Sequence, residues 1–278
     1  MIEAFLTSPF LWMALLAGIA ASITSGVMGS FVVVKRIVFI SGSISHSVLG
    51  GMGLFLWIQR TYDVSWISPI QGAILAAIAS ALLIGWVHLE YRQREDTVIA
   101  ALWSTGMSIG VIFISLTPGY NVELMHYLFG NILWVTRADV MMLFGLDLLV
   151  IALVFLFREQ FLTICFDEQQ AKIQHVRVKL FYLLLLCLIA LSVVLLIQVV
   201  GAILVIAMLA IPAAIATGLT HRFLRVMIFS VLLGWGFTFV GIATSYQLNW
   251  PPGATIALVA ALCYLLSFIL KKRISKAS

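Results

Sequence analysis

Charged residues are scarce in this sequence, and two long stretches have none. Residues 180–220 carry no formal charge, and neither do residues 226–270, whose apolar character is broken only by Asn249–Gly253. The whole chain is 63% hydrophobic and 10% charged, with a mean hydropathy of +1.15. A soluble domain of this size could not hide so much apolar surface from water. The chain is therefore predicted to be a polytopic membrane protein with one transmembrane domain, residues 1–278.

Other absences exclude whole classes of function. The three cysteines are dispersed, with Cys165 in a loop and Cys187 and Cys263 inside apolar segments, so neither a disulfide framework nor a CxxC metal site is expected. No G-x-x-x-x-G-K-[ST] phosphate loop occurs, so any ATP that drives the protein must bind another polypeptide. There is no HExxH motif either, and we expect the chain not to be an enzyme.

The apolar stretches have the length of membrane helices. A helix rises about 1.5 Å per residue and the hydrocarbon core is about 30 Å thick, so each long uncharged run holds roughly two spans. The stretches lack the alternating pattern of barrel strands, which predicts an all-α helix bundle with about eight to nine spans. Five further spans are expected in Ala4–Val34, Ile37–Gln59, Val64–Val87, Thr97–Val122 and Val140–Phe157.

Basic residues predict the orientation. If the N-terminus lies outside, only Arg60 and Arg137 among the 16 lysines and arginines face outside, which is the asymmetry expected of the positive-inside rule. The net charge of +5 is then a topology signal and not a nucleic-acid surface, because the basic residues are scattered over loops. The first apolar segment lacks a basic region before it, so we expect it to remain as a span. Residues 121–136 are too short to cross and are predicted to form a re-entrant or interfacial outer segment.

Small residues and one histidine mark two of the helices. Ala14, Gly18, Ser22, Gly26 and Ser30 recur every four residues along the first span, which favours a close packing seam. In the second span, Gly42, His46 and Gly50 share a stripe that Gly53 extends, so the sequence predicts open space around the imidazole. Two interpretations of His46 remain: it lines a pathway through the membrane, or it is hydrogen-bonded to Ser45 or to a neighbouring helix.

Other ionisable residues are weaker candidates. Asp147, in the middle of the fifth span, is either protonated and satisfied locally or pairs with His46 or a passing cation. Glu123 and His126 form an E-x-x-H pair that could receive a cation at the outer mouth or be ordinary surface residues. Pro212 cannot donate a helical hydrogen bond and is a candidate helix bend.

The longest basic cytoplasmic loop, Arg158–Lys179, is a candidate docking element for a partner ATPase. Asp167, with Gln170 three residues later, resembles the capping start of a short helix that continues through Ala171. An ordinary solvated connector is the alternative.

Several motifs occur in order along the chain, namely Gly29–Val33, Ile44–Ser47, Leu124–Gly130, Val200–Leu204, Ile211–Ala214 and the loop around Asp167. Together they resemble the permease subunits of ABC importers for zinc, manganese or iron, and the similarity spans almost the whole chain. The resemblance implies a homodimeric permease in the bacterial cytoplasmic (inner) membrane. The basic residues place its C-terminus in the cytoplasm. The resemblance also implies a cytoplasmic ATP-binding subunit, an extracytoplasmic metal-binding protein, and a divalent metal ion as transported substrate, most simply zinc, with no stably bound cofactor.

One departure from the family pattern concerns the metal pathway. The family carries an aspartate one helical turn before the histidine of the second span, and here that residue is Gly42. Three hypotheses follow: His46 acts with fewer ligands, Asp147 supplies the missing carboxylate, or the substrate is a chelated metal or another small solute. A secondary metal transporter is a further alternative, although Asp147 is the single carboxylate in the middle of a span and no convincing repeat relates the two halves.

Overall fold

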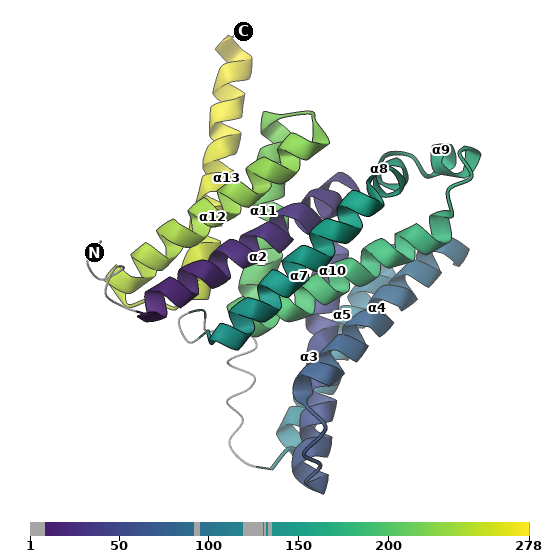
Figure 1. The fold of residues 1–278 in the computed structure, drawn as a ribbon, viewed down its shortest axis with the longest axis vertical. Helices are drawn as coiled ribbons and strands as arrows, with labels where there is room; N and C mark the ends of the chain where they lie inside the picture. Colours follow the sequence, from purple (N-terminus) through teal and green to yellow (C-terminus); the bar gives the residue numbers. More distant parts are fainter. Residues whose placement is uncertain (1–8, 92–94, 119–129, 131, 133–134, 278) are drawn as a thin grey trace. The chain divides into compact units, whose positions relative to one another are not determined.

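The computed structural model describes the backbone of residues 9–91, 95–118, 130, 132 and 135–277 (Figure 1). Within these residues the chain forms eleven α-helices and no strand, which confirms the all-α prediction. The helices are α2 (Pro9–Val34), α3 (Val38–Tyr62), α4 (Pro69–Tyr91), α5 (Glu95–Leu116), α7 (Arg137–Leu156), α8 (Arg158–Phe166), α9 (Glu168–Ile173), α10 (Val178–Val200), α11 (Ala202–Leu219), α12 (Phe223–Leu248) and α13 (Pro252–Ala277).

Nine of these helices are long and apolar enough to cross a membrane, namely all except the short helices α8 and α9. This number matches the segments expected from the uncharged runs. Most of the outer segment 121–136 lies outside the described residues, and its predicted re-entrant form therefore stays a prediction.

Local sequence signals account for several helix ends. Prolines begin α2, α4 and α13, because the first helical position needs no backbone N–H and the ring fixes a helical φ. Asp63 and Asn249 close α3 and α12 in the left-handed region, at φ 51° and 55°. Short polar side chains tolerate this conformation better than most others, and it turns the chain out of the helix.

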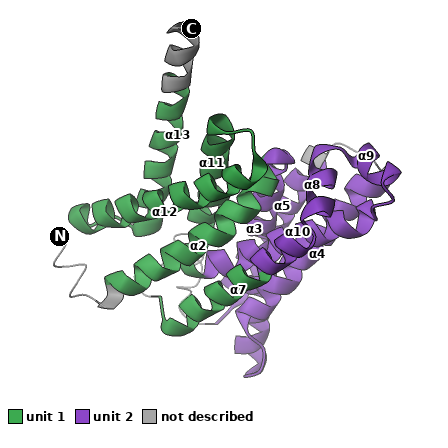
Figure 2. Ribbon diagram, turned by 45° about the horizontal axis from the view of Figure 1, so that its top comes forward, with its two compact units in different colours: residues 1–33, 129–149, 199–278 green, residues 34–128, 150–198 purple. Residues whose placement is uncertain are grey.

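The chain divides into two compact units, coloured separately in Figure 2. Unit 1 comprises residues 1–33, 129–149 and 199–278, and therefore contains α2, most of α7, and α11 to α13. Unit 2 comprises residues 34–128 and 150–198, and contains α3, α4, α5, α8, α9 and most of α10.

In unit 1, the small-residue stripe of α2 is a packing seam, as predicted. A Cβ atom at Gly26 would lie 2.7 Å from the backbone nitrogen of Val231 in α12, so only glycine allows the two backbones to come this close. One turn further, the hydroxyls of Ser30 and Ser230 lie 3.4 Å apart. The seam thus fixes α2 against α12 through backbone contact and a polar pair.

A second close approach in unit 1 joins two glycines with positive φ. Gly201, at φ 83°, separates α10 from α11. Gly130, at φ 62°, packs against this break, since a Cβ atom there would lie 2.2 Å from the carbonyl carbon of Val200. Both positions therefore favour glycine for its conformation, and Gly130 also requires it for space.

In unit 2, α3 packs against both α4 and α5. The contact with α4 is again made by glycines, because a Cβ atom at Gly51 would lie 2.2 Å from the carbonyl oxygen of Gly72. Helix α3 is therefore held on two sides by backbone-to-backbone contacts, and this positions the histidine that it carries.

Candidate functional site

His46 lies in the third turn of α3 and stacks on an aromatic ring of α5. The centroids of the His46 and Trp103 rings are 4.4 Å apart, with 17° between the ring planes. The Nδ1 atom of His46 is buried and has no hydrogen-bond partner in the described part of the chain. The interpretation in which His46 is hydrogen-bonded to Ser45 or to a neighbouring helix therefore does not hold at this nitrogen within the described residues. The Ser45 hydroxyl instead donates to the carbonyl oxygen of Ser41, 2.9 Å away in the same helix.

Gly42, one turn before His46, faces the same indole. A Cβ atom at Gly42 would lie 3.4 Å from the Cζ3 atom of Trp103, which is ordinary van der Waals contact. The indole of Trp103 thus covers both Gly42 and His46. The surface next to Gly42 is therefore aromatic.

The prediction that Gly50 and Gly53 line open space is wrong. A Cβ atom at Gly50 would lie 2.8 Å from the carbonyl oxygen of Gly106, and one at Gly53 would lie 2.8 Å from that of Gly110. Glycines at these positions let α3 and α5 touch backbone to backbone, as small residues commonly do in membrane bundles. The residues that reasoning from α3 alone missed are therefore Trp103, Gly106 and Gly110, and the G-x-x-x-G spacing of the last two was a visible signal.

Asp147 lies in α7 and is buried within unit 1. The hydroxyl of Thr24 in α2 donates a hydrogen bond to its Oδ1 atom, while its Oδ2 atom has no partner among the described residues. Asp147 is thus partly satisfied locally. Because His46 belongs to unit 2, the pairing of these two residues stays a prediction.

No group of three or more histidine, cysteine, aspartate or glutamate side chains that could hold a metal occurs within the described residues. Glu123 and His126, the predicted outer pair, lie outside those residues. Pro212 is buried and lies inside α11, and the helix continues on both sides of the proline.

The loop after α7 contains the predicted short helix. The Asp167 carboxylate caps α9 by accepting hydrogen bonds from the backbone nitrogens of Gln169, at 2.8 Å, and Gln170, at 3.1 Å. This confirms the capping prediction and satisfies two backbone groups that a helix start leaves unpaired. The backbone N–H of Asp167 donates to the carbonyl oxygen of Thr163, so that donor is satisfied by the end of α8.

Helix α9 has a buried side and an exposed side. Ala171 is fully buried and packs α9 against the rest of unit 2. Its side chain is therefore not on the surface, and the prediction that Ala171 docks the ATPase is wrong. The exposed side presents Gln170, with the large apolar side chains of Phe166 and Ile173 on either flank of the helix. Exposed apolar side chains beside polar ones are typical of a surface that binds another protein.

The site around His46 can offer one imidazole to a passing ion. A neutral imidazole is a common metal ligand, and an indole face attracts cations. A single ligand in apolar surroundings would hold a cation weakly, which suits a conduction route better than storage, because a full set of ligands would trap the ion.

Comparisons with known proteins agree on one family. Residues 7–271 match the ABC 3 transport family. The chain is 50% identical to a probable metal transport system membrane protein of Chlamydia pneumoniae, over 93% of this chain and 88% of that one. It is 33% identical to the manganese transport system membrane protein MntC of Listeria monocytogenes, over 96% of this chain and 93% of that one.

Solved structures give the same result. The structure of PsaBC from Streptococcus pneumoniae in complex with Fab is similar with a TM-score of 0.83 and 30% identity, over 96% of this chain and 94% of that chain. A putative metal-chelate type ABC transporter in an inward-facing conformation shares the fold, with a TM-score of 0.76 and 14% identity. The chain therefore belongs to the ABC 3 transport family, the metal-type ABC permeases that its motifs resemble.

Proposed function

We propose that the chain is the permease through which an ATP-driven importer moves a divalent transition-metal ion across the bacterial cytoplasmic membrane. The observation that carries this proposal is His46, an intramembrane imidazole whose buried Nδ1 atom has no partner among the described residues. Ionisable groups inside membrane helices usually mark substrate pathways, because they are costly to bury without a function.

Two arguments bear on the metal. A relative 33% identical to the chain is named for manganese transport, which favours manganese. Imidazole suits zinc and iron better than manganese, and Gly42 contributes no carboxylate of the kind that manganese prefers. The proposed substrate class is therefore a divalent transition-metal ion, and the zinc expected from the sequence is one of three metals to test.

The proposed partners follow from the absence of a phosphate loop in the sequence and from the exposed side of α9. A separate ATPase is needed because the sequence has no phosphate loop, and the exposed side of α9 with Phe166 and Ile173 is the proposed docking surface. We further propose a homodimer that receives the metal from an extracytoplasmic binding protein, with the N-terminus outside and the C-terminus in the cytoplasm.

The test is transport by the purified complex. The chain would be purified with the ATPase that accompanies it, reconstituted in lipid vesicles, and supplied with radioactive manganese, zinc or iron in separate experiments. We expect ATP-dependent accumulation of at least one metal, and no ATP hydrolysis by the chain alone. Accumulation that needs a proton gradient and no ATP would instead support a secondary transporter, and a failure to move any of the three metals would contradict the proposed substrate class.

A further inference from the structure

Three ionisable side chains from three separate segments meet beside α9. The Oε1 atom of Glu168, the first residue of α9, lies 2.5 Å from the Nζ atom of Lys35 and 3.5 Å from the Nε2 atom of His88 in α4. The Lys35 ammonium also donates to the carbonyl oxygen of Ile164 near the end of α8, at 2.9 Å. We call Lys35, His88 and Glu168 the α9 anchor, and all three belong to unit 2.

A buried tyrosine of α10 forms one wall of the anchor. The rings of Tyr182 and His88 have their centroids 4.8 Å apart, and the Lys35 Nζ atom lies 5.7 Å from the centroid of the Tyr182 ring. An ammonium within about 6 Å of an aromatic centroid is attracted to the ring. The anchor therefore connects α8 and α9 to the turn before α3, to α4 and to α10.

The carboxylate of the anchor stays charged at physiological pH. The hydrogen bond from His88, followed by the one from Lys35, lowers the pKa of Glu168 from its ordinary value of 4.5 to about 2, although partial burial acts in the opposite direction. Removing one partner of such a group leaves a partly buried charge without compensation, so the anchor responds to mutation as a unit.

The position of Lys35 gives the anchor its significance. Lys35 lies directly after α2 and three residues before Val38, where α3 begins, and α3 carries His46 about two turns further on. A displacement of α9 therefore reaches the start of the His46 helix through one ion pair. The same pair connects the proposed ATPase surface to the proposed pathway without passing through an apolar contact.

We propose that the α9 anchor transmits ATPase motion to the helix that carries His46, so that Lys35, His88 and Glu168 are positioning residues for transport and not metal ligands. This inference rests on the proposed function, because it takes α9 as the element that the ATPase contacts. It makes a distinct claim: breaking the anchor separates ATP hydrolysis from metal movement while the ATPase remains bound.

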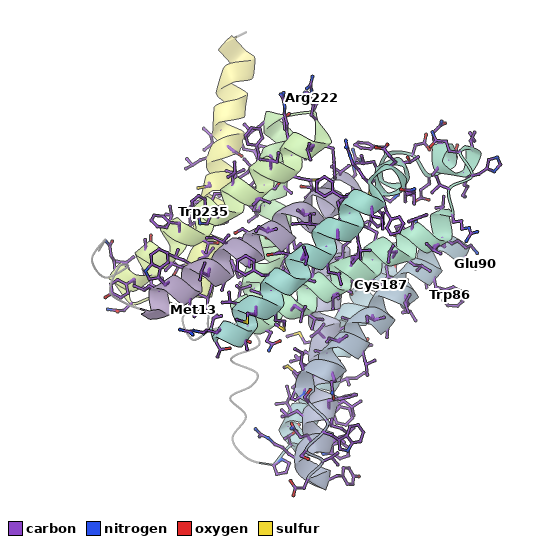
Figure 3. All side chains as sticks on the ribbon, in the orientation of Figure 1. Met13, Trp86, Glu90, Cys187, Arg222 and Trp235 are labelled. Atoms are coloured by element: carbon purple, nitrogen blue, oxygen red, sulfur yellow. The ribbon has the colours of Figure 1, made fainter. Side chains whose placement is uncertain are left out.

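Unit 2 offers a matched control pair. Lys179 of α10 and Glu90 of α4 form an ion pair of 3.2 Å, but their side chains are 73% and 53% exposed, against 14% for Lys35 and 27% for Glu168. Glu90 is labelled in Figure 3. Exposed pairs contribute little because water and salt screen them, so the same substitutions in this pair report the effect of charge loss alone.

The experiment uses the reconstituted complex with its ATPase and measures three quantities: the ATPase recovered with the permease, ATP hydrolysis, and radioactive manganese or zinc moved per ATP. For Glu168→Gln and Lys35→Met we expect unchanged ATPase recovery and hydrolysis, with metal moved per ATP falling about three- to thirtyfold. Lys35→Arg, Glu90→Gln and Lys179→Met should keep the wild-type ratio. If Glu168→Gln or Lys35→Met does not give a monodisperse complex, His88→Gln, which leaves the ion pair between Lys35 and Glu168 in place, is used instead.

An unchanged ratio of metal to ATP in the anchor variants would overturn the proposal. So would a fall in uptake matched by an equal loss of bound ATPase, because the anchor would then only shape the docking surface. Failure of the proposed function looks different, since the wild-type chain itself would then bind no ATPase or move no metal.

Discussion

The surroundings of His46 and of Glu168 differ in how completely each group is satisfied. His46 has an aromatic ring on one face and a buried nitrogen with no partner among the described residues. Glu168 is contacted by two cationic or titratable side chains, and its pKa is lowered accordingly. Burial of an unpaired polar atom is costly, so an incompletely satisfied group is where a substrate can be accommodated. The satisfied cluster is instead suited to hold elements together.

The strongest test of this difference removes the imidazole. His46→Ala should reduce metal uptake to background, because no other histidine lies in the described part of α3 to replace it. ATPase recovery should stay at the wild-type level, because His46 belongs neither to α9 nor to the α9 anchor. Uptake by whole cells at normal expression gives the measurement.

His221→Ala is the control, since it removes an exposed histidine between α11 and α12. The His221→Ala variant should take up metal at the wild-type rate. Normal uptake by His46→Ala would remove the pathway assignment and leave the small residues of α3 as a packing surface only.

The second largest effect should come from the exposed side of α9. Ile173→Glu places a charge on an exposed apolar residue and should lower ATPase recovery about tenfold, as expected for a central contact residue. The thermal stability of the permease should not change. Gln174→Glu, at the exposed residue that follows, is the control and should leave recovery within about twofold of wild type.

Ala171→Glu should behave differently from Ile173→Glu. Because Ala171 is fully buried, a carboxylate there must displace α9 or remain without a partner, so we expect a loss of thermal stability as well as of ATPase binding. Equal stability of the two variants would contradict the assignment of buried and exposed sides to α9.

A smaller effect is expected at Asp147. Asp147→Asn keeps a side chain of the same shape beside Thr24 but removes the charge, and we expect uptake to fall several-fold if this carboxylate serves the pathway. Adding Gly42→Asp should restore part of the uptake by returning a carboxylate one turn from His46. Trp103 lies in contact with Gly42, so the restoration should be larger with Trp103→Leu than without it.

Thr24→Val is the control, because it removes the hydrogen bond to Asp147 and keeps the carboxylate. Wild-type uptake by Asp147→Asn would discard compensation by this residue while leaving the role of His46 intact.

Local signals were enough to predict part of this architecture. The uncharged runs predicted the nine long helices, because the length and composition of a span are properties of one segment. Asp167 and the start of α9 were predicted for the same reason, since a cap and its partners lie within a few residues.

Contacts between distant segments could not be predicted in this way. The spacing of Gly50 and Gly53 shows that they share a helix face, but it does not say that the face meets Gly106 and Gly110 of α5. The α9 anchor joins Lys35, His88 and Glu168, which are far apart in the sequence and show no common motif. A pairing of this kind becomes visible only when the helices are packed.

The smallest expected effect concerns the reactivity of Cys165, a buried residue next to the α9 anchor. This prediction is about the rate of alkylation and not about transport. Burial disfavours the thiolate and raises the pKa of Cys165 from its ordinary value of 9.0 to about 12, although the nearby Lys35 acts in the opposite direction. Because only the thiolate reacts quickly, alkylation at pH 8 should be on the order of a thousandfold slower in the folded protein than after denaturation. The measurement uses a variant in which Cys187 and Cys263 are replaced by alanine.

The same thiol then reports on the anchor. If Lys35→Met leaves α8 in place, the loss of a nearby positive charge makes the thiolate still less favourable, and alkylation of Cys165 should stay slow or become slower. If the substitution instead releases α8 and α9 from unit 2, the thiol becomes exposed and alkylation becomes faster. Slow alkylation together with a reduced ratio of metal to ATP would show that the anchor acts by transmitting motion, because its surroundings would still be folded when coupling is lost.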